Sequence, residues 1–142
     1  MLFCLKGGAS GDISLKENES SNDYVVWLLE NSGIAMPSPL VYEGLVYIAE
    51  RNRGRVTCIE AKTGKIIYRN QLTDARTFWA SPWACDGKIF FLEEKGTTYV
   101  IQAGREFKVI AENKLDDGFL STTAIKDNAY IFRGEKGIYC VK

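Results

Sequence analysis

The chain has 142 residues and a mass of 15.9 kDa, a length that suits one domain and disfavours two of ordinary size. Eighteen Lys and Arg residues balance eighteen Asp and Glu residues, so the net charge of zero gives no global attraction to nucleic acid or to an acidic membrane surface. There is no histidine, which excludes Ser-His triads, histidine acid–base catalysis and His-ligated metals from this chain.

The first 29 residues begin and end with a short apolar segment. Met1–Lys6 has neither the positively charged start nor the apolar core of a secretory signal peptide, so the chain is either cytoplasmic or a piece of something longer. Val25–Leu29, the longest unbroken aliphatic and aromatic run, is too short to cross a bilayer, and we expect no membrane span. The polar residues 7–23 are either a functional loop or a tolerated surface excursion, and Asn18 begins a match to the glycosylation sequon.

Three copies of one pattern follow along the chain. Ser38–Ile48 recurs 43 residues later as Ser81–Phe91 and, after a further 41 residues and with more divergence, as Thr122–Phe132. A second series lies between these copies, and three of its members place a cysteine at the same position. Its members are Leu2–Lys6, Val56–Glu60, Thr98–Gln102 and Ile138–Lys142. Self-similarity at a period of about 40 residues indicates a repeat architecture.

Each copy has the local signals of short strands, which are rich in β-branched and aromatic residues and are separated by turns that contain glycine. In the first copy the predicted strands are Leu40–Tyr42, Leu45–Ala49, Val56–Glu60 and Ile66–Arg69. Glu43-Gly44 and Asp86-Gly87 lie between apolar strands, where a two-residue hairpin turn requires positive φ, and Asn128 stands in the third such turn. No long window has an apolar period of about 3.6 residues, so we expect essentially no helix.

The strands predict sheets that are covered on both faces. Val46–Ile48, Ile89–Leu92 and Tyr130–Phe132 are apolar at consecutive positions, whereas a sheet with one wet face would alternate. Four short antiparallel strands at this period are typical of a β-propeller, in which each blade packs between its neighbours; a two-sheet sandwich is the alternative. The predicted fold is therefore all-β, a partial β-propeller of about three four-stranded antiparallel blades in a single domain.

The predicted strands divide the chain into complete and incomplete blades. Residues 1–29 form the end of one blade, residues 30–70 and 71–112 form one full blade each, and residues 113–142 form an incomplete blade. Closed propellers have about 4 to 8 blades, and fewer would leave apolar faces and strand edges without partners. We therefore expect either the remainder of a longer propeller or a homo-oligomer that closes a ring by self-association.

The four cysteines match no zinc or redox motif. Cys4, Cys58, Cys85 and Cys140 show no C-x-x-C spacing and no adjacent pair. Because three of them occupy one repeat position, we expect buried, unpaired thiols that pack as small hydrophobic groups.

One group of residues is a candidate binding site. If the first strand of each blade is innermost, the loop at residues 50–55 and the connection at residues 75–79 lie near each other on one face of the disc. The candidates are Arg51, Arg53, Arg55, Arg76, Phe78 and Trp79. Such a surface suits a carboxylate, sulfate or phosphate group, or the stacking of a sugar ring. The alternative is a set of solvated arginines, with Phe78 and Trp79 filling the space between blades.

The stretch from Thr57 to Tyr68 carries a recognisable pattern. Together with the Ser-Pro-(x)4-Gly motif of Ser38–Gly44, Ala61-Lys-Thr-Gly-Lys-Ile-Ile-Tyr68 resembles the pyrroloquinoline-quinone-like β-propeller repeat family, which includes quinoprotein dehydrogenases and an outer-membrane assembly scaffold. In these dehydrogenases the segment is a docking motif that ends in Trp, where this chain has Tyr68, and Trp27 ends the corresponding strand of the first blade. The resemblance implies that both aromatics wedge neighbouring blades, and it implies a periplasmic or cell-envelope location.

Two hypotheses of function follow from the resemblance. The first is a non-catalytic binding or scaffold module that presents a loop face to a protein, peptide or glycan. The second is a fragment of a pyrroloquinoline-quinone- and Ca²⁺-dependent alcohol or sugar dehydrogenase. Members of that class need a Ca²⁺ site and many have a vicinal disulfide, but this chain has no adjacent cysteines, and its loop carboxylates, Glu93 and Asp117 among them, are expected to be solvated. We expect no cofactor, no metal and no enzymatic activity from this chain alone.

Overall fold

The computed structural model describes residues 1–142 and contains thirteen β-strands and no helix, which confirms the all-β prediction. It contains no helix that could cross a membrane. The strands are β1 (Leu2–Leu5), β2 (Val25–Leu29), β3 (Leu40–Tyr42), β4 (Leu45–Ala49), β5 (Arg55–Glu60), β6 (Ile66–Gln71), β7 (Trp83–Cys85), β8 (Lys88–Leu92), β9 (Thr97–Gln102), β10 (Val109–Lys114), β11 (Ala124–Lys126), β12 (Ala129–Arg133) and β13 (Ile138–Val141).

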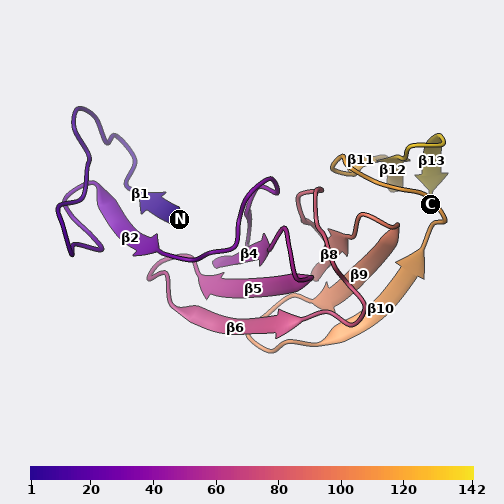
Figure 1. Cartoon of the computed structure of the whole chain (residues 1–142), viewed down its shortest axis with the longest axis horizontal. Helices are drawn as coiled ribbons and strands as arrows, with labels where there is room; N and C mark the ends of the chain where they lie inside the picture. Colours follow the sequence, from indigo (N-terminus) through magenta and orange to yellow (C-terminus); the bar gives the residue numbers. More distant parts are fainter.

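Four antiparallel sheets follow one another in chain order and along an arc in space (Figure 1). The N-terminal sheet is β1-β2, two four-stranded sheets are β3-β4-β5-β6 and β7-β8-β9-β10, and the C-terminal sheet is β11-β12-β13. Within each four-stranded sheet the strands lie in chain order from the concave to the convex side of the arc (Figure 1). This order is β4, β5, β6 in one sheet and β8, β9, β10 in the other. This arrangement is a partial β-propeller, as the repeat pattern predicts.

The hairpin between the first two strands of each repeat has the predicted geometry. A two-residue type I′ turn needs positive φ at both positions, because only then does its twist match that of the flanking strands. All three turns meet this requirement, with φ values of 49° and 76° at Glu43-Gly44, 49° and 66° at Asp86-Gly87, and 49° and 64° at Asp127-Asn128. The two-residue turns therefore set the register of each hairpin.

The core is divided into layers between adjacent sheets. In β4, Tyr47 faces the following sheet, where it packs with Phe91 and Ile101, and Val46 faces the preceding sheet, where it packs with Trp27. All five residues of β4 are consequently buried. Because every inner strand contacts a neighbouring sheet on each side, both of its faces must be apolar, which explains the consecutive apolar residues in the sequence.

Aromatic side chains of the outer strands wedge neighbouring sheets. Trp27 is 8% exposed, and its Nε1–H donates a hydrogen bond of 2.9 Å to the carbonyl oxygen of Ala61 in the next sheet. Its ring lies against Gly64, where an added Cβ would come within 2.7 Å of the indole. One repeat later Tyr68 packs beside Phe107 of the following sheet, with ring centroids 5.5 Å apart. Both aromatics lie between sheets, as expected of wedges.

Two sets of hydrogen bonds also cross from sheet to sheet. The Ser38 N–H donates to Ser81 Oγ over 2.9 Å, and the Ser81 N–H donates to Thr122 Oγ1 over 3.0 Å. These hydroxyl residues lie two residues before the innermost strands, at equivalent repeat positions. A main-chain series links the loops after the second strands to the inter-sheet connections: Arg51 to Gly33, Phe78 to Arg51, Glu94 to Thr77, Phe119 to Glu94 and Glu135 to Gly118. We call this series the inter-blade belt.

The cysteines are all unpaired, but the expectation that all four are buried is wrong. Cys58 is fully buried, and burial raises the pKa of its thiol to about 11, so it packs as a neutral group. Cys4 and Cys85 are half-buried, and Cys140 is exposed. Cys140 occupies the same repeat position as Cys58, but in this chain no further sheet covers that face of β13.

Candidate functional site

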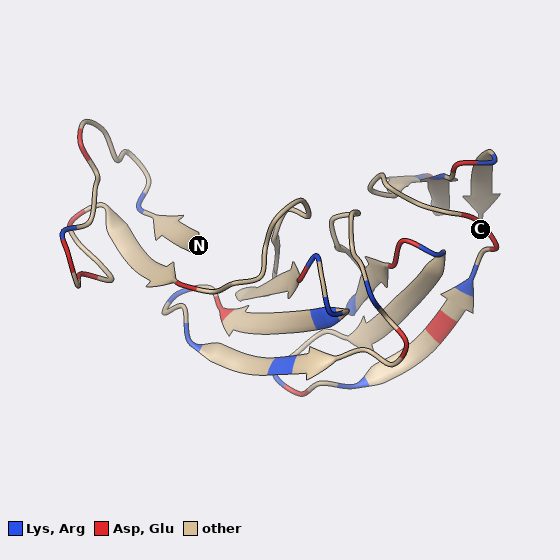
Figure 2. Ribbon diagram, viewed as in Figure 1, with Lys and Arg blue, Asp and Glu red and all other residues tan.

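The structure brings together the two loops that carry the predicted binding residues. Asn52 and Thr77 form an isolated antiparallel bridge, and the Phe78 N–H donates to the Arg51 carbonyl oxygen over 3.0 Å. In Figure 2 the β4–β5 loop and the β6–β7 connection both carry basic residues. The proximity that the sequence predicts for these loops is therefore present, and the inter-blade belt holds it.

A glycine permits this close approach. Gly54 has a φ of 60°, and a Cβ at this position would lie 2.0 Å from the carbonyl oxygen of Ala75. Its N–H donates to the Arg76 carbonyl oxygen over 2.9 Å, and its carbonyl oxygen accepts from the Leu72 N–H over 3.0 Å. The equivalent Gly96 makes the same kind of approach to Leu115 in the next blade. Any side chain at Gly54 would push the two loops of the site apart.

Arg51 and Trp79 are the centre of the candidate site. The guanidinium carbon of Arg51 lies 4.2 Å from the centroid of the Trp79 ring, a cation–π geometry. Both side chains are half-buried, and neither Arg51 Nε nor Trp79 Nε1 has a hydrogen-bond partner. Arg53 and Arg76 are exposed beside them, and none of the three arginines forms a salt bridge. We call Arg51, Arg53, Arg76 and Trp79 the arginine rim.

Arg55 has a different partner. Its guanidinium pairs over 2.8 Å with Glu50, a carboxylate that is 2% exposed and that Arg69 also contacts over 2.9 Å. Thr57 donates a further hydrogen bond to Glu50 over 3.2 Å. Because a buried carboxylate is stable only when it is paired and hydrogen-bonded, Arg55 and Arg69 are needed to stabilise Glu50. Arg55 is therefore a structural residue next to the rim.

Phe78 is a core residue in this structure. It is 0% exposed and packs with Phe91 at a centroid distance of 6.2 Å, within the layer between the two four-stranded sheets. Its backbone belongs to the inter-blade belt while its side chain points into the core. Of the two roles that the sequence allows for Phe78, the structure shows the one that fills the space between blades.

Two loop carboxylates that we expect to be solvated are buried instead. Glu93 is 3% exposed and accepts a hydrogen bond of 2.7 Å from the Lys95 N–H. Asp117 is 6% exposed and accepts from the Gly118 and Lys136 N–H groups and from the Tyr139 hydroxyl, over 2.7, 3.0 and 2.9 Å. The expectation from the sequence is wrong because each turn folds back over its own carboxylate. Backbone N–H groups then take the place of water as hydrogen-bond donors to the carboxylate.

The ionised Asp117 side chain should make the free energy of unfolding depend on pH. Burial by itself raises the pKa of the Asp117 carboxyl, but hydrogen bonds from Lys136, Gly118 and Tyr139 lower it below its ordinary value. The ionised form therefore stabilises the fold above the unfolded pKa of about 3.9, and this contribution disappears as the pH falls through the lower, folded pKa. Thermal unfolding of the wild type and of Asp117→Asn from pH 7 to pH 2 should give a difference that shrinks below about pH 4. A difference independent of pH would contradict this assignment.

The residues of this chain do not fit a metal-dependent quinone site. No group of three or more Cys, Asp or Glu side chains gathers where it could hold a metal ion. The buried carboxylates Glu50, Glu93 and Asp117 have arginine, backbone or tyrosine partners as described above. No catalytic step through a Ca²⁺-bound quinone is therefore assigned to this chain.

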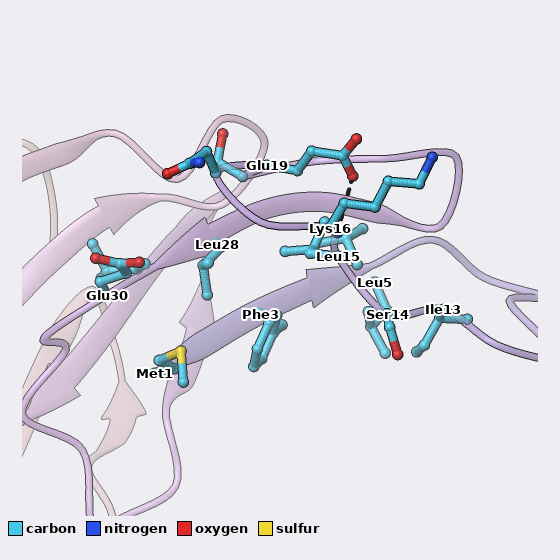
Figure 3. A pocket seen from close by; sticks show the side chains of 14 residues that line it. Met1, Phe3, Leu5, Ile13, Ser14, Leu15, Lys16, Glu19, Leu28 and Glu30 are labelled. Carbon is cyan, nitrogen blue, oxygen red and sulfur yellow. Dashed lines mark hydrogen bonds between the residues drawn. The ribbon is translucent and has the colours of Figure 1, made fainter.

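A concave surface that sequence reasoning missed lies at the N-terminal sheet. A groove of about 920 Å³ is lined on one side by Phe3, Leu5 and Leu28 of β1 and β2. Ile13 and Leu15 of the 7–23 segment line it from the other side, and Figure 3 shows these side chains together. We call it the N-terminal groove. Seven of its fourteen lining residues belong to residues 7–23, so this segment is a wall of a groove rather than a detached excursion.

Asn22 organises that wall. Its Oδ1 accepts hydrogen bonds from the Tyr24 and Val25 N–H groups over 2.8 and 2.7 Å. Its Nδ2 donates to the carbonyl oxygens of Ile13 and Ser14 over 3.3 and 3.2 Å. This half-buried amide thus ties the middle of the segment to the start of β2 and holds Ile13 near the sheet. The only sequence signal was the Ile-x-Leu pair at residues 13 and 15 within an otherwise polar stretch.

Comparison with known proteins supports the architecture. No family model and no curated protein matches the chain. Among solved structures, BamB from Moraxella catarrhalis superposes with a TM-score of 0.58 at 12% sequence identity over 72% of this chain. The fold is that of a β-propeller. The match spans only 30% of the BamB chain, so this chain corresponds to a part of that propeller.

Proposed function

We propose that this chain is a non-catalytic binding or scaffold module whose arginine rim binds an anionic group presented by a protein, a peptide or a glycan. The observation that carries the proposal is the stacking of Arg51 on Trp79 at 4.2 Å with no carboxylate partner for Arg51, Arg53 or Arg76. A guanidinium held in place by an aromatic ring loses less conformational freedom on binding.

The rigid surroundings of the rim support the same function. Arg51 donates and accepts main-chain hydrogen bonds of the inter-blade belt, and Arg76 accepts one from Gly54. Rigid loops at one end of stacked blades form a wide surface on which contacts are positioned in advance. The proposal includes the periplasm or cell envelope as the location, which rests on the family resemblance of the Ala61–Tyr68 segment.

Substitution in the rim should weaken binding of simple anions in solution. We expect a heparin-derived hexasaccharide or a hexaglutamate peptide to bind, and the double variant Arg51→Gln with Arg76→Gln to bind it about tenfold more weakly, since each exposed charge pair contributes at most about 1 kcal/mol. Isothermal titration calorimetry measures both constants. Binding of the wild type should also weaken as salt is raised.

Arg105→Gln is the matched control, because Arg105 is exposed and pairs with Glu60 at 3.0 Å, away from the rim. It should change affinity by less than about twofold. If neither probe binds, or if Arg105→Gln lowers the affinity as much as the double variant does, the rim is not the binding surface. Oxidation of an alcohol by the chain after addition of pyrroloquinoline quinone and Ca²⁺ would favour the dehydrogenase hypothesis instead.

A further inference from the structure

The N-terminal sheet has one covered face and one apolar face that no other sheet covers. Cys4 and Trp27, which are register partners, pack on the β3–β6 sheet. Phe3 and Leu28, also partners, point to the opposite side and line the N-terminal groove together with Leu5. Phe3 is 47% exposed and Leu5 is 50% exposed. An exposed apolar face of this kind marks an interaction surface.

The C-terminal sheet has the complementary property. Phe132 and Tyr139, which are register partners, pack in the layer next to the β7–β10 sheet. Ile131 pairs with Cys140 in the register and both point the other way, as does Ile138, which is 75% exposed. This face of β12 and β13 is apolar and uncovered.

Within the molecule, each place where one sheet packs on the next, here called an internal junction, joins a face equivalent to the uncovered C-terminal face with one equivalent to the uncovered N-terminal face. Cys140 has Cys58 as its repeat equivalent, and Ile131 has Tyr47. Cys58 and Tyr47 are both buried against the following sheet. Ile59 is the equivalent of Leu5, and it is buried against the preceding sheet. The uncovered C-terminal face is thus the kind that packs on a following sheet, and the uncovered N-terminal face is the kind that receives a preceding one.

The two end segments of the chain carry net charges of opposite sign. Residues 1–30 contain two lysines and five acidic residues, whereas residues 124–142 contain four Lys and Arg residues and two acidic ones. Lys16, Glu19 and Glu30 stand at the rim of the groove. A chain with no net charge is therefore polarised from end to end, which favours a head-to-tail encounter over a head-to-head one.

The 7–23 segment suits such a junction as well. At internal junctions the connection after the third strand receives an aromatic from the outer strand of the preceding sheet, as Trp27 packs on Gly64. The C-terminal sheet carries no strand at the position of β6 and β10. In the N-terminal sheet the corresponding connection is the 7–23 segment, and it brings its own apolar side chains, Ile13 and Leu15, to that place.

We propose that the N-terminal groove is occupied by a second copy of this chain, whose β11-β12-β13 sheet stacks on β1 and β2 in the manner of the internal junctions. The contact is heterologous: each chain uses its C-terminal face on one neighbour and its N-terminal groove on the other. Such a contact closes a ring or extends as a filament according to its rotation.

The test uses light scattering of the full chain after size exclusion. The wild type should show at least twice the 15.9 kDa of one chain, with a mass that decreases on dilution and at high salt. Leu5→Glu should disable the N-terminal groove and Ile138→Glu the C-terminal face, so that neither variant forms a junction by itself. Each variant alone should elute at one-chain mass, and their mixture should form a two-chain complex, because one intact junction remains. Met36→Glu, at a position 60% exposed in a loop, is the matched control and should assemble like the wild type.

Labelling of Cys140 gives a second measurement that does not depend on variants. In a single chain Cys140 is exposed, whereas a junction would bury it as Cys58 is buried. The rate of its reaction with a maleimide, followed by peptide mass, should fall as protein concentration rises. A wild type of one-chain mass at all concentrations, a mixture that stays at one-chain mass, or a Cys140 rate independent of concentration would overturn the proposal. Circular dichroism melts confirm that both variants are folded.

Discussion

Replacement of Phe78 by alanine is expected to lower the free energy of unfolding by about 3 to 5 kcal/mol, because it deletes a fully buried ring and leaves a cavity between two sheets. Phe78 is 0% exposed and packs with Phe91 in the layer that joins the four-stranded sheets. The cost should fall in the upper part of this range, since the belt holds the Phe78 backbone and limits collapse of the cavity.

Urea unfolding followed by tryptophan fluorescence measures this change, with Tyr24→Ala as the control. Tyr24 is 38% exposed, so the loss of its ring should cost less than about 1 kcal/mol. Binding of the anionic probes to folded Phe78→Ala should be close to that of the wild type. A variant with nearly unchanged stability but weakened binding would show that Phe78 contacts ligand, which its burial argues against.

Replacement of Trp27 by alanine is expected to have an effect of similar size, about 3 to 5 kcal/mol, confined to the N-terminal sheet. The indole fills the space over Gly64, donates to Ala61 and is the one buried side chain of β1 and β2 in the cluster that joins them to the next sheet. Trp27→Phe is the matched comparison, because it keeps an aromatic ring and loses the hydrogen bond, which contributes about 1 kcal/mol, together with part of the packing.

Amide hydrogen exchange separates this local effect from global unfolding. In Trp27→Ala the amides of β1 and β2 should lose protection while those of β4, β5, β8 and β9 keep most of theirs, since these strands retain neighbours on both sides. Uniform loss of protection would mean that the N-terminal sheet unfolds only together with the others. Unchanged protection throughout would mean that Trp27 is not the wedge described above.

Much of the fold follows from local signals. The predicted bounds of β3 and β4 agree with the structure, and those of β5 and β6 differ by one or two residues at an end. The turns at Glu43-Gly44 and Asp86-Gly87 were predictable because a two-residue hairpin restricts φ within four residues of chain. The proximity of the 50–55 and 75–79 loops was predictable because antiparallel strands alternate in direction, so the connections after the second and fourth strands of a blade emerge on the same face of the disc.

Contacts between distant residues were not accessible in this way. Nothing near Arg55 distinguishes it from Arg53, yet one pairs with buried Glu50 and the other is exposed. Cys58 and Cys140 have similar sequence surroundings, and only the presence or absence of a covering sheet separates their burial. The groove at residues 7–23 depends on Asn22, whose amide meets partners eight and nine residues away.

The amino-acid order by itself determined that this protein is a series of antiparallel β-sheets with tight hairpins and apolar residues on both faces, because turn geometry and side-chain alternation act over a few residues. Tertiary structure alone decided which apolar faces are covered, which charges are paired and where a concave surface forms. Those properties depend on the atoms that surround a side chain, and in this fold such atoms come from a neighbouring sheet about 40 residues away in sequence.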